Sequence, residues 1–508
     1  MKGRRPLRAR RPRLGTANAA DGARTLVAGA RMLVAGAVVA LLVVACSGPA
    51  PVTASQPNAD TVAAAITEEG LRARLETLAA ATGTSGQYRA VGSAGYDSAA
   101  TLVEQQLRSA GWTVTADEYN SATFVDEGGS SLEVGGRTFG VDDLRPLIFA
   151  PPGDVDGPIV PIDWVPGATD PTGKGCSITD YGDLPAHAIV LVRPGDCLRR
   201  DQAVAAQQAG AAAFVAVYPN VPAGIMFRPT LIGPGTVRIP AAAVSRAVAE
   251  ALVAATVASG TVASGTAGAG TAHLVTHART AQAPTRSVIA ELPGSKPGPV
   301  IMLGAHLDSV IDGPGINDDG SGVAALLEIA RALGGTRAQA TVRMAFWSGE
   351  ELGLHGSFRY TAALSAEQAR AILVYANVDM IASPNGFAGV YDEPGAPAGS
   401  SAARELMSAA VTRAGGTPVG IDLHSGSDHY GFAQAGVATA GVFSGASDPV
   451  SGEQAAASRA TAGQPADTCY HQSCDDVENA DLGLARVLAA SLADFTVRVA
   501  NNPALLGH

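Results

Sequence analysis

Apolar, strand-like runs alternate with helix-like segments through the second half of the chain. The strand-like runs are RSVIAELPG (286–294), PVIMLGAHL (299–307), ATVRMAFWS (340–348) and ILVYANVDM (372–380). Helical spacing occupies about 322–333 and 366–371. Several runs are apolar throughout, which is typical of strands buried on both faces. The alternation predicts an α/β fold with a mixed, largely parallel central sheet flanked by helices.

Two further helices are expected before this region. Residues 59–81 carry apolar positions at helical spacing, and a second helix should end at Gly111, where glycine can adopt the left-handed cap. From about 144 to 283 the pattern changes to short apolar runs broken by Pro and Gly, with one helical stretch at 198–210. We therefore expect residues 144–283 to be a smaller α/β insert between residues 59–143 and 284–500.

The N-terminus carries an export pattern. Several arginines precede the apolar run MLVAGAVVALLVVAC at 32–46, which is shorter than the ~20 residues of a spanning helix and is typical of a signal peptide. The ending VVAC resembles a bacterial lipobox. We expect a signal peptide at 1–45, lipidation of Cys46, and a Pro/Ser/Ala-rich tether at 46–58 that holds the protein on the outer face of the cytoplasmic membrane. A cleaved signal and a secreted protein are the alternative.

Composition and cysteine usage agree with export. The 508 residues are 47% hydrophobic and 16% charged, and the net charge of −11 argues against a nucleic-acid-binding face. Five cysteines are present. If Cys46 is lipidated, Cys176 with Cys197 and Cys469 with Cys474 form two pairs close in sequence, each a candidate disulfide in an oxidising compartment. A metal site at Cys176 and Cys197 is the alternative.

Acids and histidines collect where the expected strands end. They are His306 and Asp308, Asp318 and Asp319 in GINDDGSG, Glu350 and Glu351, Asp379, and His471 in DTCYHQSCDD. Ligands of α/β sheets bind beyond the carboxyl ends of the strands, and carboxylates that converge there need a cation. Imidazole and carboxylate ligands without thiolates suit zinc or another divalent transition metal better than calcium. The structural alternative is that Asp308 and Asp319 cap turns and that the paired glutamates begin a helix.

The ordered set HxD, NDDGSG, EE, D and YH resembles that of the co-catalytic di-zinc aminopeptidases typified by secreted Streptomyces and Aeromonas enzymes. The resemblance implies a zinc-exopeptidase-like fold. The stretch IVLVRPGDCLRRDQAVAAQQAGAAAFVAVY and the later IPAAAVS resemble a protease-associated domain, with an unrelated α/β insert as the alternative.

The resemblance implies residue roles at two zinc ions. His306 and Asp379 would hold one ion, Glu351 and His471 the other, and Asp318 would bridge them. Asp308 would orient His306, because a ligating imidazole usually donates its other N–H to a carboxylate or carbonyl.

The family motifs also imply the catalytic groups. Glu350 would be the general base, and Tyr470 would hydrogen-bond the tetrahedral oxyanion, with simple packing as its alternative. Cys469 and Cys474 would pin the loop that presents Tyr470.

The segment HSGSDHYGF (424–432) is similar to a segment beside the family's substrate cleft, so Asp428 and His429 are expected to line the site. Some relatives have an arginine where Gly426 stands here, and this departure leaves side-chain preference open.

These expectations add up to a monomeric, lipid-anchored, zinc-dependent aminopeptidase that acts on peptides. Within the same fold, a carboxypeptidase or a one-zinc glutaminyl cyclase is the rival interpretation. A non-enzymatic, peptide-binding lipoprotein is another.

Overall fold

The computed structural model describes residues 54–82, 88–162, 174–217, 226–258 and 270–507, and the side chains within them except those of 256–258. The expected signal peptide, Cys46 and most of the tether lie outside the described residues. Within the described part, two eight-stranded sheets carry the fold.

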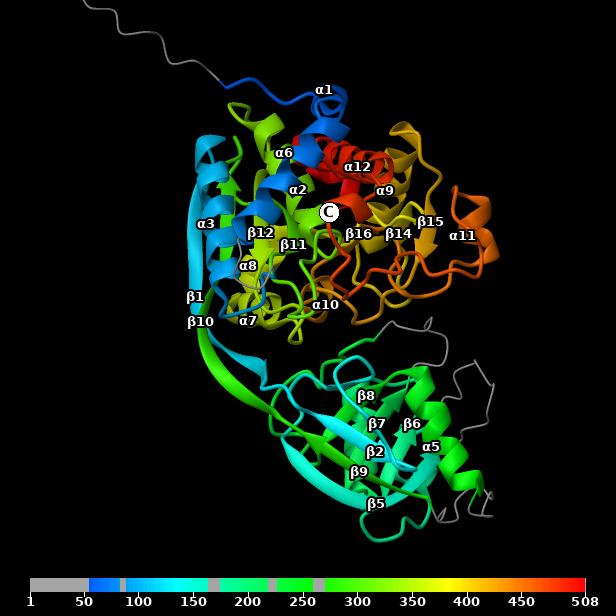
Figure 1. Cartoon of the computed structure of the whole chain (residues 1–508). Coiled ribbons are helices and arrows are strands. Elements are labelled where there is room, and N and C mark those ends of the chain that lie inside the picture. Colours follow the sequence, from blue (N-terminus) through cyan, green and yellow to red (C-terminus); the bar gives the residue numbers. More distant parts are fainter. Residues whose placement is uncertain (1–53, 83–87, 163–173, 218–225, 259–269, 508) are drawn as a thin grey trace, which may run out of the picture. The chain divides into compact units, whose positions relative to one another are not determined.

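The first sheet is mixed, with parallel strands at its centre (Figure 1). Its strands, in spatial order, are β1 (Thr113–Asp126), β10 (Ala278–Leu292), β12 (Thr341–Trp347), β11 (Val300–His306), β13 (Ile372–Val378), β16 (Thr439–Phe443), β14 (Gly389–Tyr391) and β15 (Val419–Ile421). β11 pairs in parallel with both β12 and β13, while β10 pairs antiparallel with β12. The α/β fold expected from the sequence is confirmed.

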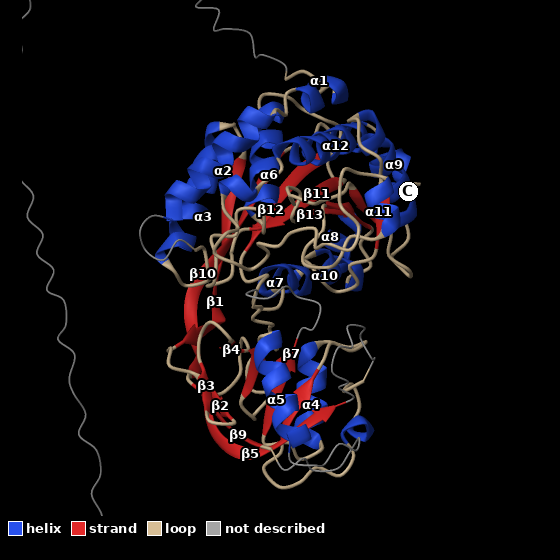
Figure 2. Ribbon diagram, turned by 45° about the vertical axis from the view of Figure 1, so that its right-hand side comes forward, coloured by secondary structure: helices blue, strands red, loops and turns tan. Residues whose placement is uncertain are grey.

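Helices cover both faces of this sheet (Figure 2). On one face lie α1 (Ala59–Ala64), α2 (Glu68–Thr82), α3 (Ala94–Ser109), α6 (Gly320–Leu333), α9 (Ser400–Arg413) and α12 (Leu482–Asn501). On the other lie α7 (His355–Ala363), α8 (Ala366–Ala371) and α10 (His429–Gln434). Along β11, Ile301 and Leu303 pack into the first core and Val300 and Met302 into the second, so the strand is buried on both sides.

The second sheet belongs to the insert. Its spatial order is β3 (Arg137–Phe139), β2 (Ser131–Val134), β9 (Thr271–Thr276), β5 (Gly153–Ile162), β6 (Ile189–Val192), β7 (Ala213–Val217), β8 (Ala241–Val244) and β4 (Leu144–Pro146). Helices α4 (Arg199–Gln208) and α5 (Arg246–Ala258) accompany it. The strands of this sheet run from 131 to 276, whereas the sequence placed the insert at 144–283. The start differs because the hairpin β2–β3 pairs with β9, and the end differs because β10 starts at Ala278 in the first sheet.

One expected helix is two. The periodicity at 59–81 covers α1 and α2, and the break falls just before Glu68 because the Thr67 Oγ1 accepts a hydrogen bond from Gly70 N at 3.0 Å, which starts a new helix. The helix expected to end at Gly111 is α3, and the helices expected near 322–333 and 366–371 are α6 and α8. In the described part of the chain, no helix is both long and apolar enough to cross a membrane.

Candidate metal centre and active site

Three neighbouring strand ends carry the central side chains of the site. His306 is the last residue of β11, Glu350 and Glu351 follow the end of β12, and Asp379 follows β13. Because β11 pairs in parallel with both neighbours, His306 lying opposite Trp347, these carboxyl ends meet at one edge of the sheet. The acidic and histidine positions predicted from the strand ends are therefore brought together.

Asp318 lies between the two histidines and offers one oxygen to each. Its Oδ1 is 3.1 Å from His306 Nε2, and its Oδ2 is 3.0 Å from His471 Nε2. The same His306 nitrogen lies 3.6 Å from Asp379 Oδ1, and the same His471 nitrogen lies 3.0 Å from Glu351 Oε2. Five donor groups thus form two clusters that share Asp318.

The donor set fits zinc. Bonds of about 2.0–2.2 Å in a tetrahedral site place neighbouring ligand atoms about 3.4 Å apart, and the nitrogen–oxygen distances here run from 3.0 to 3.6 Å. Glu351 Oε1 is buried without a hydrogen-bond partner among the described residues. A buried carboxylate oxygen in that state is costly unless a cation binds it. His306, Asp318 and Glu351 also offer one ligand atom each within 4.8 Å of one another.

The two histidines lower the pKa of the Asp318 carboxyl group. Burial of Asp318 acts to raise its pKa, but the hydrogen bonds from His306 and His471 outweigh it and bring that pKa well below its ordinary value. Asp318 is therefore a carboxylate, as a metal bridge requires.

Asp308 organises the turn that carries the two glutamates. Its carboxylate accepts hydrogen bonds from the backbone N–H groups of Gly349 (2.8 Å), Glu350 (3.1 Å) and Glu351 (3.3 Å). Its backbone carbonyl, rather than its carboxylate, accepts from His306 Nδ1 at 3.0 Å, since the carboxylate oxygen is 4.0 Å away. Burial raises the pKa of Asp308 to about 6.

Both carboxylate oxygens of Asp319 accept hydrogen bonds from backbone N–H groups. Its Oδ1 accepts from Gly322 N at 2.8 Å, which caps α6, and from Met380 N at 3.2 Å, while its Oδ2 accepts from His306 N at 3.1 Å. Asp319 thereby ties the end of β11 to the residue after Asp379.

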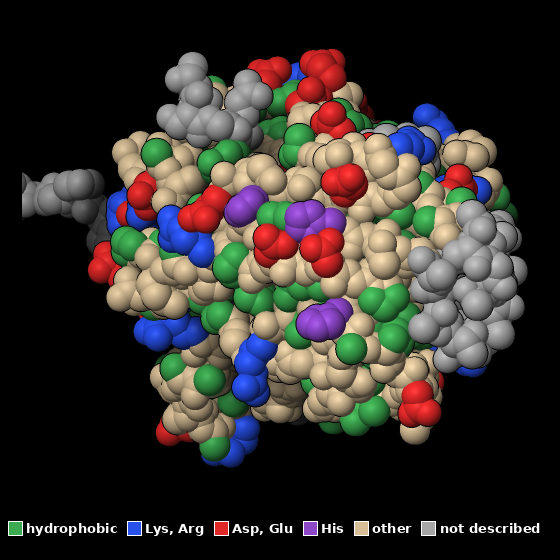
Figure 3. Space-filling view, turned by 60° about the horizontal axis from the view of Figure 1, so that its bottom comes forward, with side chains coloured by type: hydrophobic (Ala, Val, Ile, Leu, Met, Phe, Trp, Pro, Cys, Tyr) green, Lys and Arg blue, Asp and Glu red, His purple; other side chains and the backbone are tan. Residues whose placement is uncertain are grey.

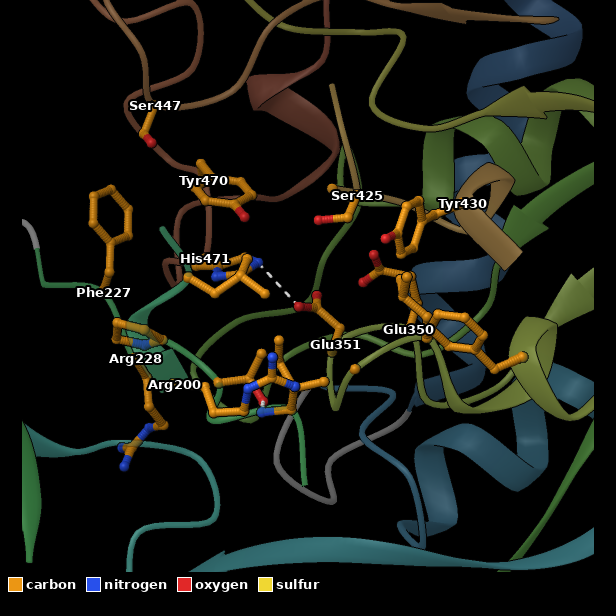
Figure 4. A pocket seen from close by; sticks show the side chains of 18 of the residues that line it. Arg200, Phe227, Arg228, Glu350, Glu351, Ser425, Tyr430, Ser447, Tyr470 and His471 are labelled. Atoms are coloured by element: carbon orange, nitrogen blue, oxygen red, sulfur yellow. Dashed lines mark hydrogen bonds and ion pairs between the residues drawn. The ribbon is translucent and has the colours of Figure 1, made fainter. Parts of the chain in front are cut away.

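A pocket of about 590 Å³ opens beside this centre and is lined from both the first sheet's loops and the insert (Figure 4). Glu350, Glu351, Tyr470 and His471 contribute polar groups. The apolar lining consists of Leu198, Phe227, Pro229, Ile232, Leu354, Phe358 and Tyr430. In the space-filling view, acidic and histidine side chains gather near the middle of one face (Figure 3).

Burial raises the pKa of both predicted catalytic side chains. Burial, together with the nearby carboxylate of Glu351, raises the pKa of Glu350 well above its ordinary value. Burial and nearby carboxylates likewise raise the pKa of Tyr470, so its phenol is neutral at physiological pH and can donate a hydrogen bond.

Asp428 and His429 do not line the pocket, in contrast to the expectation from the sequence. Both are buried at the start of α10, where His429 Nε2 lies 2.6 Å from Glu393 Oε1. Their neighbours Ser425, Gly426 and Tyr430 line it instead. The reason is helical geometry: α10 turns the side chains of successive residues to different faces.

Two residues beside the centre were missed by sequence reasoning. Ser427 Oγ donates to Asp379 Oδ2 at 2.6 Å and so fixes that carboxylate. Arg89 is fully buried and donates to the carbonyls of Leu307 (2.8 Å), Gly315 (2.8 Å) and Pro314, which shapes the loop between His306 and Asp318. Neither has a local signal, because each acts across a long sequence separation.

Both candidate disulfides are formed. Cys469–Cys474 closes the short loop that contains Tyr470 and His471, and Cys176–Cys197 lies in the insert. His355 Nδ1 lies 2.8 Å from Ser121 Oγ.

Comparisons with known proteins identify the family of this chain. Residues 287–496 match the model of peptidase family M28, and residues 155–252 match the PA domain. A "Probable lipoprotein aminopeptidase LpqL" of Mycobacterium tuberculosis is 34% identical over 441 residues, which cover 84% of each chain. The chain belongs to peptidase family M28.

Further relatives extend this result. An "Aminopeptidase" of Pseudomonas aeruginosa is 32% identical over 83% of this M28 chain and 79% of the relative. Among solved structures, the aminopeptidase of Aneurinibacillus sp. strain AM-1 aligns with a TM-score of 0.67 at 23% identity, covering 87% of this chain and 96% of that one. The zinc aminopeptidase of Bacillus subtilis aligns with a TM-score of 0.64 at 21% identity, covering 86% of this chain and 96% of that one. As an M28 member with a PA domain, the protein is a metallopeptidase and hence a hydrolase.

Proposed function

We propose that this M28 peptidase is a two-zinc aminopeptidase that removes residues from the free amino end of peptides. The observation that carries the proposal is the position of Asp318, with one carboxylate oxygen 3.1 Å from His306 Nε2 and the other 3.0 Å from His471 Nε2. A single metal would not require both oxygens to face separate histidines. His306 and Asp379 would hold one zinc, Glu351 and His471 the other, and Asp318 both.

Zinc bound at these residues would supply Lewis-acid chemistry, which activates a water molecule and polarises the scissile carbonyl. The protein's own groups determine where that chemistry acts. The Asp308 carboxylate holds the turn at 349–351, so Glu351 points towards His471 while Glu350 faces the pocket.

Glu350 would act as the general base. Its raised pKa brings the carboxyl closer to neutral pH, where a base can accept a proton in one step and release it in the next. Its carboxylate would take a proton from the attacking water and deliver it to the nitrogen of the leaving amine. Glu351 cannot share this role if a cation neutralises it.

Tyr470 would stabilise the oxyanion. Its phenol lines the pocket beside His471, with the two ring centroids 3.8 Å apart. Because its pKa is raised, the hydroxyl keeps its proton and donates a hydrogen bond that strengthens as negative charge develops on the carbonyl oxygen.

The choice of the amino end rests on the relatives and on the charges of the pocket. Two relatives about one-third identical over more than four-fifths of this chain are named aminopeptidases. A carboxypeptidase would need a cation for the substrate carboxylate. Of the pocket's arginines, Arg228 is held by Asp312 and Asp126, and Arg200 is paired with Asp201. Both guanidinium groups therefore already have carboxylate partners within the protein.

Mass spectrometry of a peptide mixture tests this function. Peptides with free or acetylated amino termini, and with free or amidated carboxyl termini, are sampled over time with and without a chelator. Stepwise shortening from free amino termini alone, abolished by the chelator, is the expected result. Shortening from the carboxyl end would make the protein a carboxypeptidase, cyclisation of amino-terminal glutamine would make it a cyclase, and no change in any peptide would contradict catalysis.

We also propose that Cys46 anchors the protein to the membrane, with the PA domain insert shaping access to the pocket. The lipobox-like VVAC and the lipoprotein name of the Mycobacterium tuberculosis relative support an anchor. In a cell that processes lipoproteins, wild-type protein should partition into detergent and Cys46→Ser should not. Equal partitioning of both would contradict the anchor.

A further inference from the structure

We propose that segment 226–228 of the PA domain insert is a positioning element of the active site, which holds Tyr470 in place through its own loop. The inference rests on the proposed role of Tyr470. It assigns the insert a part in turnover as well as in access to the pocket.

Two contacts join this segment to the loop at 470–472. The rings of Phe227 and Tyr470 pack with centroids 5.7 Å apart and planes tilted by 55°. Two residues after Tyr470, Gln472 Nε2 donates to the Met226 carbonyl at 2.6 Å. A ring contact and a hydrogen bond therefore hold both ends of the short stretch that presents the phenol.

Arg228 anchors the segment to the rest of the protein. Its side chain is 3% exposed and forms a two-pronged pair with Asp312, Nε to Oδ2 at 2.9 Å and Nη2 to Oδ1 at 3.2 Å. It also lies 2.8 Å from Asp126 Oδ2 and donates to the Pro146 carbonyl at 3.1 Å. A planar guanidinium with this many partners fixes the direction of the backbone on either side of it.

The anchor reaches the same loop that carries metal ligands. Asp312 lies between His306 and Asp318 in the chain, on the loop shaped by Arg89. Segment 226–228 therefore spans from this loop to the loop of Tyr470. The Cys469–Cys474 disulfide restrains the Tyr470 loop from within, and the insert restrains it from across the pocket.

The position of Tyr470 matters because a hydrogen bond to a developing oxyanion depends steeply on distance and angle. Phe227 also lines the pocket, so its loss would change substrate binding as well. The two effects separate kinetically. Loss of a pocket wall raises KM, whereas displacement of Tyr470 lowers kcat.

A double-mutant cycle with zinc-loaded full-length protein tests the proposal. Phe227→Ala and Tyr470→Phe are made singly and together, and kcat, KM and zinc content are measured on one peptide. Tyr470→Phe should lower kcat by about 100-fold, the typical effect of losing an oxyanion donor. Phe227→Ala should lower kcat roughly 10-fold in the wild-type background, because small displacements weaken oriented contacts, and less than about 2-fold beside Tyr470→Phe. The rise in KM should persist in both backgrounds, and zinc content should stay unchanged.

Three variants sharpen this test. Gln472→Leu removes the bond to Met226 without touching the pocket wall, and should lower kcat only when Tyr470 is present. Phe227→Leu keeps apolar volume if the alanine variant fails to fold, and should show the same dependence on Tyr470. Ile178→Ala truncates an apolar side chain of the insert that is 50% exposed and outside the pocket, and should change nothing.

The outcomes are distinguishable. Equal losses of kcat from Phe227→Ala in both backgrounds, or no loss in either, would overturn the positioning role while leaving the aminopeptidase function intact. Wild-type kcat in Tyr470→Phe would instead remove Tyr470 from the proposed mechanism and overturn the inference with it.

Discussion

The backbone N–H of Glu350 donates a hydrogen bond to Asp308 Oδ1 at 3.1 Å. The same carboxylate also receives the N–H groups of Gly349 and Glu351. One buried aspartate thus sets the direction of two adjacent glutamates, so that Glu351 joins the His471 cluster and Glu350 faces the pocket. Neighbouring residues with identical side chains can then differ in function.

Glu350→Gln should lower kcat strongly and leave the metal in place. Loss of a general base costs roughly 10²–10⁴ in kcat, and the amide keeps the shape of the side chain. The zinc content and thermal midpoint of Glu350→Gln should match those of the wild type. The exposed control Glu367→Gln should match the wild type in kcat, zinc content and thermal midpoint. A Glu350→Gln protein with normal kcat would remove this residue from the mechanism.

Asp308→Asn should weaken zinc binding by about 10–100-fold, as changes beside metal ligands commonly do. The asparagine NH₂ cannot accept the N–H bonds that the second carboxylate oxygen accepts, so the turn at 349–351 shifts. Competition against a chelator of known affinity measures the effect, with the exposed Asp156→Asn as control. Unchanged zinc affinity would mean that the turn at 349–351 keeps its conformation without the Asp308 carboxylate.

Arg89→Met should destabilise the protein strongly. The substitution leaves three carbonyls without their donor, those of Leu307 and Gly315 buried and that of Pro314 partly buried. Each buried unsatisfied group costs about 1–3 kcal/mol, so the free energy of unfolding should fall by roughly 2 kcal/mol or more. Denaturant unfolding measures it. Arg72→Met removes only a surface pair 3.9 Å apart and should change stability by less than about 0.5 kcal/mol. Equal effects of both variants would show that the loop at 307–315 does not depend on Arg89.

Removal of metal should cost more stability as the pH rises. Burial raises the pKa of Asp308 to about 6. It also raises well above the ordinary value the pKa of Asp319 and that of Asp475, whose carboxylate accepts the backbone N–H groups of Asn317 and Asp318. A buried acid with a raised pKa binds more protons folded than unfolded, so without metal its contribution to stability falls as the pH rises from about 4 to 6. Metal binding acts oppositely, because it improves as ligands lose protons.

The difference in thermal midpoint between zinc-loaded and chelator-treated protein should therefore grow between pH 5 and 7. Calorimetry at several pH values measures it. A difference that shrank over this range would contradict the acidic centre as the source of the effect.

The two disulfides should differ in their effect on zinc. Replacing Cys469 and Cys474 by serine frees the loop that carries His471, so a zinc ion bound at the proposed ligands Glu351 and His471 should be lost more readily on dialysis. Replacing Cys176 and Cys197 is the matched control and should leave zinc content unchanged, since that disulfide lies in the insert. Equal zinc retention in both double variants would show that the short loop keeps its shape unaided.

The sequence predicted the centre better than its surroundings. Strand-end positions such as His306 and Asp379 could be found because an apolar run and a following polar residue are local signals. The ligand roles of these residues came from a family resemblance and stay predictions. Ser427, Arg89 and Phe227 could not be found, because each contacts the site from a segment far away in the chain.

In the fold, too, features with local sequence signals were predicted, and features that depend on a single cap or on distant contacts were missed. Alternating strands and helices predicted the α/β class, since the pattern reports which faces are buried. The break before α2 was missed because it depends on one threonine cap, and the early start of the insert was missed because it depends on pairing between β2 and a strand more than 130 residues later. Placing Asp428 in the pocket failed because SDH lies at the start of a helix, whose turn points that side chain inward.

The ribbon of β1 and β10 leads into and out of the insert through two paired strands, whose last partners are Asp126 and Ala278. A tight turn joining those two residues would close the ribbon as an ordinary hairpin. The pairing of β1 with β10 therefore does not require the insert. Any chain that replaced it would need to cover the apolar side chains of Phe124 and Leu352, which pack into the insert's core, and to bring its own wall for the pocket and its own partner for Gln472.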